Sequence, residues 1–150
     1  MKITIIAVGK SKSGPEAGMV AEYLKRLPWQ ITIIEIEEKR PLPSLEKMES
    51  EGQKLLAAIP KGHYVVAMDK GGKNLSSKDF ARSMEKWVAS FQGITFIIGG
   101  ADGLSEKVLS RAHSKLSFGA ATWPHMLARV MLVEQLYRAF AIREGHPYHK

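Results

Sequence analysis

The chain has 150 residues without cysteine, and 22 basic against 15 acidic side chains give a formal net charge of +7. This length favours one domain over residues 1–150, and 45% hydrophobic with 25% charged residues argues against a disordered chain. The absence of cysteine excludes disulfides, a thiolate nucleophile and a Cys-based zinc site, while the positive charge favours a polyanionic partner.

The N-terminal half alternates between strands and helices. A short β-branched run at residues 3–8 predicts a buried strand. A helix is expected from Pro15 to about Leu27, because proline suits the first turn of a helix. Alternation over residues 30–37 predicts a second strand, and the next helix is expected over residues 44–59 with its first serine as the N-cap.

The C-terminal half continues this alternation. We expect strands at 64–68, 94–98 and 115–118, the first of them followed by a turn at 69–72. The helices between and after them are expected from Ser76 or Ser77 to 91, at 105–112 and at 125–144. Five strands alternating with five helices predict an α/β fold, a parallel sheet with helices on both faces.

Glycines follow three of the later strands, at Gly71–Gly72, Gly99–Gly100 and Gly119. Open α/β sheets bind ligands outside the carboxyl ends of their strands, and glycine allows a ligand close to the backbone. The three turns are therefore expected to form one pocket. The phosphate motifs fail, because the segment 9–14 lacks the Lys-Ser/Thr of a P-loop and the segment 99–103 lacks the dinucleotide pattern.

The last helix is apolar on more than one side, which favours burial in the core or at a dimer interface. Its charged residues Arg129, Glu134 and Arg138 then need partners, and they argue against a membrane span. The histidines do not show metal-ligand spacing. We expect a cytoplasmic homodimer that contacts no membrane and holds no metal.

Four segments together resemble the ribosomal large subunit methyltransferase H family. They read IIGGADGLS at 97–105, TWPHMLARV at 122–130, EQLYRA at 134–139 and HPYHK at 146–150. The opening residues AVGK at 7–10 and EYLKR at 22–26 agree as well, so the resemblance runs through the whole chain.

This resemblance implies a SPOUT fold, in which the C-terminal part of the sheet is threaded as a trefoil knot, and a homodimer. It implies methyl transfer from S-adenosylmethionine to N3 of a pseudouridine (position 1915) in 23S rRNA of the assembled ribosome. The cofactor residues carried over from the family are Met68, Gly100, Gly119, Ala120, Ala121, Thr122, Trp123 and Pro124.

Catalytic and RNA-binding roles fall on the last helix and the tail. Deprotonation of N3 needs a general base, and His125 or Tyr148 is expected to assist it. Arg129 is expected to stabilise charge on the uracil ring or to hold phosphate. His149 and Lys150 are expected to hold RNA, although lysine lacks the bidentate fork of the family's usual arginine.

Three other functions compete with this interpretation. A transfer-RNA methyltransferase of the same superfamily would have similar glycine loops but a different tail. A non-catalytic RNA-binding factor on a decayed methyltransferase fold would not bind S-adenosylmethionine. A nucleotide-binding hydrolase is disfavoured by the failed phosphate motifs.

Overall fold

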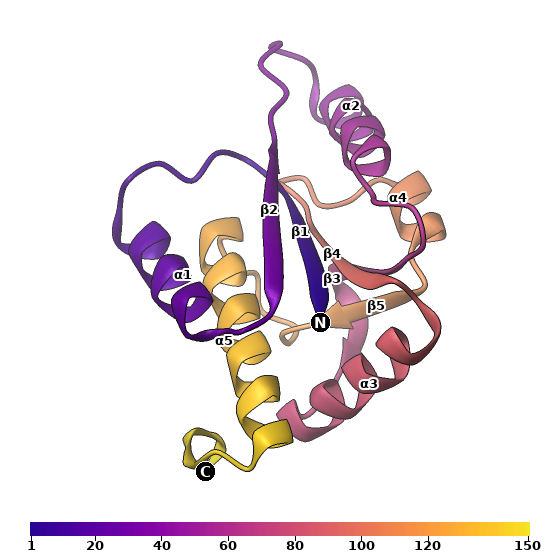
Figure 1. Ribbon diagram of the computed structural model, residues 1–150. Coiled ribbons are helices and arrows are strands. Elements are labelled where there is room, and N and C mark those ends of the chain that lie inside the picture. Colours follow the sequence, from indigo (N-terminus) through magenta and orange to yellow (C-terminus); the bar gives the residue numbers. More distant parts are fainter.

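The computed structural model describes residues 1–150, and its strands and helices alternate as expected (Figure 1). The elements are β1 (Lys2–Val8), α1 (Pro15–Arg26), β2 (Gln30–Ile36), α2 (Ser44–Ala57), β3 (His63–Asn74), α3 (Ser77–Ser90), β4 (Gly93–Ile98), α4 (Glu106–Arg111), β5 (Ser114–Ser117), α5 (His125–Glu144) and the 3₁₀ turn η1 (Pro147–His149). No helix among them is long and apolar enough to cross a bilayer.

The five strands form one parallel sheet in the order β2-β1-β4-β3-β5. At its centre, Ile5 of β1 is in register with Ile33 of β2 and Phe96 of β4. Parallel pairing brings all the carboxyl ends to one edge, so the loops after β1, β3, β4 and β5 meet there. The predicted parallel α/β sheet is confirmed.

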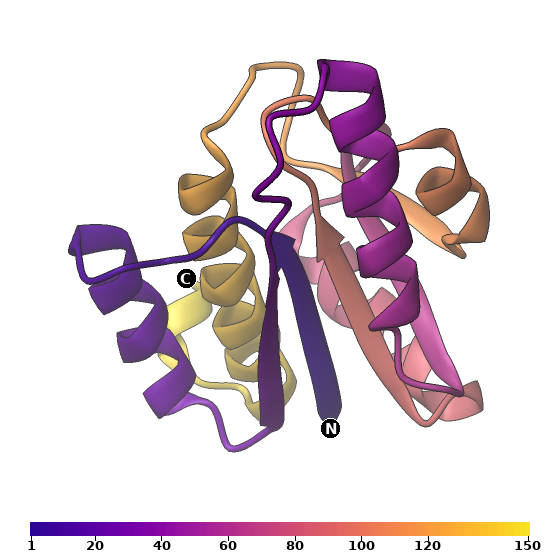
Figure 2. The ribbon, with the colours of Figure 1, turned by 90° about the horizontal axis from the view of Figure 1, so that it is seen from above.

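Helices cover both faces of the sheet, and the covering is uneven. Figure 2 shows α1 and α5 on one side of the sheet and α2 and α4 on the other. Helix α3 joins the first group, because it packs on α5 and contributes Phe80 and Met84 to the same core as Ile5 and Phe96. On the other face of the sheet, Leu55 of α2 and Val108 of α4 pack against side chains of β1, β3 and β4.

Two local expectations were wrong. The strand β3 does not end at Met68 but continues to Asn74, with a register shift against β5. Gly72 allows this part of the chain to pack closely on β5, because a Cβ there would lie 2.5 Å from the carbonyl carbon of Lys115. Ser44 is the first helical residue of α2 and Pro43 is its N-cap, without a side-chain capping hydrogen bond.

The helix α5 crosses the sheet between α1 and α3, and it ends at Gly145 in the left-handed conformation with φ of +69°. Glycine adopts this conformation without a Cβ penalty. The chain then turns back, and η1 packs on the second half of α5 through Tyr148 and Tyr137, whose ring centroids are 4.7 Å apart. The tail is therefore part of the fold.

Candidate active site

A cavity of about 570 Å³ opens at the carboxyl edge of the sheet. The ends of β3, β4 and β5 and the start of α5 form its walls, as the convergence of the later strands predicted. Its lining residues are Met68–Lys70, Ile98–Leu104, Leu116–Gly119, Ala121–His125 and Ala128. A volume of this size suits a cofactor or small ligand.

The loop after β4, residues 99–103, is held by close backbone contact. The Gly103 N–H donates to the Gly100 carbonyl at 3.1 Å. A Cβ on Gly99 would lie 3.0 Å from the carbonyl carbon and oxygen of Gly103, a spacing that real Cβ atoms rarely show. The two glycines allow the loop to fold back tightly, which leaves backbone groups facing the cavity.

The loop after β5 is fixed by its own side chains. The Ser117 hydroxyl accepts from the Gly119 N–H at 3.1 Å and donates to the Gly119 carbonyl at 2.9 Å, with Gly119 at a φ of +108°. The Trp123 indole N–H donates to the Phe118 carbonyl at 3.3 Å, while 45% of this residue stays exposed. The loop thus presents an aromatic ring in a fixed position at the mouth of the cavity.

Most of the predicted cofactor residues meet at this cavity. Met68, Gly100, Gly119 and residues 121–124 all line it, whereas Ala120 does not. The Gly71–Gly72 pair also lies outside the lining, so the prediction that this glycine turn lines the pocket was wrong, and Met68, Asp69 and Lys70 form that wall. Gly72 instead packs against the backbone of Lys115 and Leu116 in β5.

His125 lies in the cavity wall at the first position of α5. Its Nε2 packs against Gly9, where a Cβ would lie 3.1 Å from it, and Gly9 has a φ of +94°. The end of β1 therefore has to be glycine for the imidazole to reach this place. No hydrogen-bond partner within the chain occupies the ring, so it is available to a ligand in the cavity.

Arg129 lies one helical turn further along α5 and is buried, with a side chain only 3% exposed. Its Nη1 donates to Glu35 Oε2 at 2.6 Å, and its Nη2 donates to the Gly9 carbonyl at 3.2 Å. Glu35 also accepts from the Ser11 N–H at 2.6 Å. Burial raises the pKa of Glu35, but these hydrogen bonds outweigh it, and the net shift is below the usual 4.5. The buried Nε of Arg129 has no partner.

Tyr148 lies away from the cavity of its own chain. Its hydroxyl donates to Glu134 Oε1 at 3.0 Å and forms a second hydrogen bond, of 3.3 Å, with the Tyr23 hydroxyl. The Arg138 guanidinium, which also pairs with Glu134 at 2.5 Å, stacks 4.9 Å from the Tyr148 ring centroid. Burial, followed by the hydrogen bonds to Tyr23 and Glu134, raises the pKa of Tyr148 well above its ordinary value.

His149 and Lys150 follow Tyr148 at the end of the chain, and Lys150 is exposed. His149 is half-buried and its Nδ1 contacts the His146 carbonyl, while Lys150 caps the 3₁₀ turn. The structure therefore does not bring the three tail residues to His125 within one chain. The distance along α5 explains this: Glu134 is nine residues beyond His125, which corresponds to about 14 Å at the rise of an α-helix.

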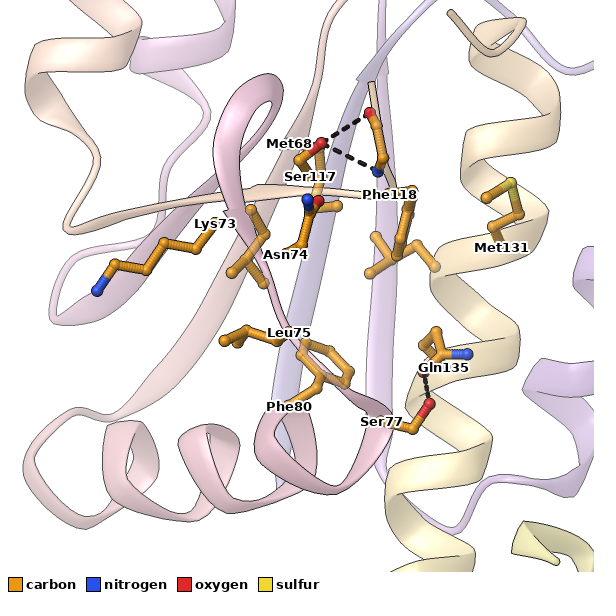
Figure 3. A pocket seen from close by; sticks show the side chains of 13 residues that line it. Met68, Lys73, Asn74, Leu75, Ser77, Phe80, Ser117, Phe118, Met131 and Gln135 are labelled. Atoms are coloured by element: carbon orange, nitrogen blue, oxygen red, sulfur yellow. Dashed lines mark hydrogen bonds between the residues drawn. The ribbon is translucent and has the colours of Figure 1, made fainter. Parts of the chain in front are cut away.

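A second cavity of about 380 Å³ adjoins the first (Figure 3). The two share Met68 and the segment 116–119, and the second continues between β3, α3 and α5. Asn74, Ser77 and Gln135 are polar groups in its wall, and the Ser77 hydroxyl donates to Gln135 Oε1 at 2.7 Å. Phe80, Phe118 and Met131 make the remainder largely apolar.

An apolar surface runs along α1 and α5 beside these cavities. Met19 is 48% exposed and Leu127 is 38% exposed, both unusual for large apolar side chains. A shallow hollow of about 210 Å³ lies on the same surface, lined by Met19, Tyr23, Phe118, Val130, Met131, Glu134 and Gln135. We call this the α1–α5 surface; exposed large apolar side chains beside a hollow favour a protein interface.

Comparison with known proteins decides which family has this architecture. Residues 1–149 match the family model described as "Predicted SPOUT methyltransferase". The chain belongs to the SPOUT methyltransferase family. It is 47% identical to a protein from Paramagnetospirillum magneticum over 100% of this chain and 99% of the relative, and 47% identical to one from Carboxydothermus hydrogenoformans over the full length of both. Both relatives are named "Ribosomal RNA large subunit methyltransferase H", so the resemblance found in the sequence is confirmed.

The fold of this SPOUT protein also resembles a solved structure described as "a probable methylase family protein from Haemophilus influenzae Rd KW20". The TM-score is 0.59 at 15% sequence identity, over 99% of this chain and 70% of the other. At this identity the likeness concerns the fold alone.

Sequence reasoning missed the residues that support the site from behind. Glu35 holds Arg129 and itself accepts from the Ser11 N–H, and neither residue belongs to a recognisable motif. Glu134 and Tyr23 hold Tyr148; both lie in segments that resemble the family, but nothing in those segments assigns them to Tyr148. The one available indication was the charge of Arg129 in an apolar helix, which required an acidic partner without saying which one.

Proposed function

We propose that this protein is an S-adenosylmethionine-dependent methyltransferase that modifies N3 of a pseudouridine in 23S rRNA of the assembled ribosome, and that residues 1–150 act as one domain in the cytoplasm. One observation carries the proposal. All but one of the residues that the family motif assigns to the cofactor line a single cavity, in a chain that shares its full length with proteins named as large subunit rRNA methyltransferases.

The cavity suits S-adenosylmethionine in volume and in chemistry. Met68, Leu104 and Leu116 offer apolar surface for an adenine ring, and the folded glycine loops offer backbone donors and acceptors. Asp69 and Asp102 line the same space and complement a cationic ligand. When bound, S-adenosylmethionine supplies an electrophilic methyl group on a sulfonium.

His125 and Arg129 have different parts in the proposed reaction. His125 faces the cavity without an internal partner, so it is placed to accept the N3 proton of a uracil ring there. Arg129 is buried and bound to Glu35 and to the Gly9 carbonyl. It acts as a positioning residue that fixes the first turn of α5, and with it His125, against the end of β1.

The proposed active site is completed by the tail of a second copy. The hydroxyl of Tyr148 points to Glu134, away from the cavity of its own chain, so a partner subunit has to bring this tyrosine to the base. The α1–α5 surface is the proposed homodimer interface, since it lies between the cavity wall at Phe118 and the tail contacts at Tyr23 and Glu134. A 3₁₀ turn docked on α5 presents the tail in an ordered form.

Tyr148 of the partner subunit then contacts the target base as a hydrogen-bond donor or by stacking. Its raised pKa keeps the phenol protonated at neutral pH, so it orients the base and leaves proton acceptance to His125. His149 and the exposed, positively charged Lys150 of the partner subunit hold the RNA backbone. A trefoil knot in the C-terminal half is also proposed, on the basis of family membership.

Mass mapping of methylated nucleotides tests the function. Ribosomes from cells that lack this gene are incubated with the purified protein and with isotopically labelled S-adenosylmethionine, and the labelled nucleotide is located in the rRNA. One labelled pseudouridine in the large subunit rRNA supports the proposal. Label in transfer RNA instead supports a transfer-RNA methyltransferase. Absence of S-adenosylmethionine binding in calorimetry supports a non-catalytic RNA-binding protein.

A further inference from the structure

Glu51 of α2 is a buried carboxyl that has no part in the proposed chemistry. It is 5% exposed, and no hydrogen bond contributes to the shift of its pKa. The other buried carboxylate of this region, Glu38, is bound by Arg40 and Lys54. No side chain of the protein bonds the Glu51 carboxyl although the residue is largely buried, so its position requires an explanation.

The carboxyl of Glu51 lies directly behind the cavity wall. A Cβ on Gly100 would be 3.5 Å from Glu51 Oε2 and 3.0 Å from Val8 Cγ1, and Gly100 itself lines the cavity. The next residue, Gly52, packs as closely: a Cβ there would lie 2.5 Å from the hydroxyl of Ser105, the N-cap of α4. One layer of backbone therefore separates the Glu51 carboxyl from the cavity.

Several charges act on this carboxyl. Burial is the largest cause of a pKa above the usual 4.5, and Lys47 opposes it from the same helix. Asp102 in the loop after β4 and Glu38 before α2 raise the pKa further, and Lys54 lowers it. Asp102 also lines the cavity, so a cation in the cavity would relieve the repulsion between the two acidic groups.

We propose that Glu51 is a positioning residue of the cofactor loop, which supports Gly100 from behind and whose ionisation favours a cationic over a neutral ligand. This inference rests on the proposed function, because S-adenosylmethionine carries a sulfonium and its product, S-adenosylhomocysteine, a neutral thioether. We expect a carboxylate behind one layer of backbone to change the ratio of the affinities for S-adenosylmethionine and S-adenosylhomocysteine by about fivefold. The protein thereby binds its substrate in preference to its product.

Calorimetric titration with both ligands between about pH 5 and pH 7.5 tests this inference. For the natural protein, the ratio of the two affinities rises by about fivefold with pH as Glu51 ionises. In Glu51→Gln the ratio is lower and changes less with pH, because the amide keeps the shape without the charge. Glu46→Gln, an exposed position in the first turn of the same helix, behaves as the natural protein. Lys47→Met moves the midpoint to higher pH, since it removes a charge that lowers the pKa of Glu51.

Each other outcome has a defined meaning. An unchanged ratio and pH profile in Glu51→Gln, with a native circular dichroism spectrum, would overturn the inference. If Glu51→Gln does not fold, Lys47→Met decides, and an unmoved midpoint rejects the role of Glu51. If the natural protein binds neither ligand, the proposed function fails and this inference fails with it, whereas tight binding with a flat pH profile refutes this inference alone.

Discussion

The ion pair between Arg129 and Glu35 connects the second turn of α5 to the end of β2. The stability lost on breaking it should depend on which of the two residues is replaced. Replacing Glu35 by alanine leaves a guanidinium that is 3% exposed without its anion, whereas replacing Arg129 by methionine leaves a carboxylate that is 28% exposed and still accepts from Ser11. Breaking a buried pair typically costs 3–5 kcal/mol, and we expect about 3 kcal/mol for Glu35→Ala because Glu35 is partly exposed. Arg129→Met should cost about 1–2 kcal/mol, since water can reach the remaining carboxylate.

Urea denaturation measures the change in the free energy of unfolding of both variants. All samples are kept at one protein concentration, because the stability of the proposed dimer would depend on it. A loss of about 3 kcal/mol corresponds to a fall of roughly 6–12 °C in Tm for a chain of this length. Glu37→Ala, an exposed position just after β2, serves as the control and should change stability by less than about 0.5 kcal/mol. In the double variant, the total loss should be smaller than the sum of the two single losses.

The same ion pair predicts the direction of a pH effect. The pKa of Glu35 is lowered in the folded protein, so its contribution to stability is complete above the usual value of 4.5 and is lost as pH falls through the lowered value. Glu35→Ala should therefore lose less stability between about pH 5 and pH 3 than the natural protein does. If Glu35→Ala costs no more than Arg129→Met, or if the two losses add, the assigned burial of the guanidinium is wrong.

Three further results are expected. Gly99→Ala should weaken S-adenosylmethionine binding in calorimetry, because the new Cβ would lie 3.0 Å from the Gly103 backbone. Gly18→Ala, in open space on α1, is the control and should leave binding unchanged. Equal affinities of the two variants would contradict the loop geometry. Tyr148→Phe should keep cofactor affinity but lose at least tenfold in methyl transfer, since it loses the hydroxyl held by Glu134, and full turnover would exclude its role. Raising salt from 50 to 200 mM should weaken rRNA binding at least tenfold if about three phosphates are contacted, and a salt-independent affinity would argue against backbone contacts.

The order and type of the elements followed from local chemistry. Buried strands such as β1 and β4 are short β-branched runs, and helix ends carry their own stop residues, as at Gly145. Serine N-caps at Ser76 and Ser105 formed the side-chain hydrogen bonds that their positions predicted. Where a preference was weak, tertiary contacts decided: the chain does turn at residues 69–72, as Gly71–Gly72 predicted, but β3 then pairs with β5 again at Lys73 and Asn74.

The candidate site also has one part that the sequence predicts and one part that only tertiary contacts decide. Its cofactor wall could be predicted because loops at the carboxyl ends of parallel strands must lie at one edge, and the family motif named most of their residues. The contacts of Arg129 and Tyr148 could not be predicted, because their partners are distant in the chain, 94 residues away at Glu35 and 125 residues away at Tyr23. Such pairs depend on how α5 crosses the sheet and on where the tail folds back.

By itself, the sequence determined the alternating strands and helices, the family and the edge of the sheet where a cofactor would bind, since each depends on residues that are neighbours along the chain or on a general rule of parallel sheets. Only the tertiary structure decided that Glu51 lies behind Gly100, that Arg129 is buried against Glu35, and that Tyr148 is directed away from the cavity of its own chain. These features depend on the packing of helices on the sheet, and packing is fixed by the fit of many distant side chains together.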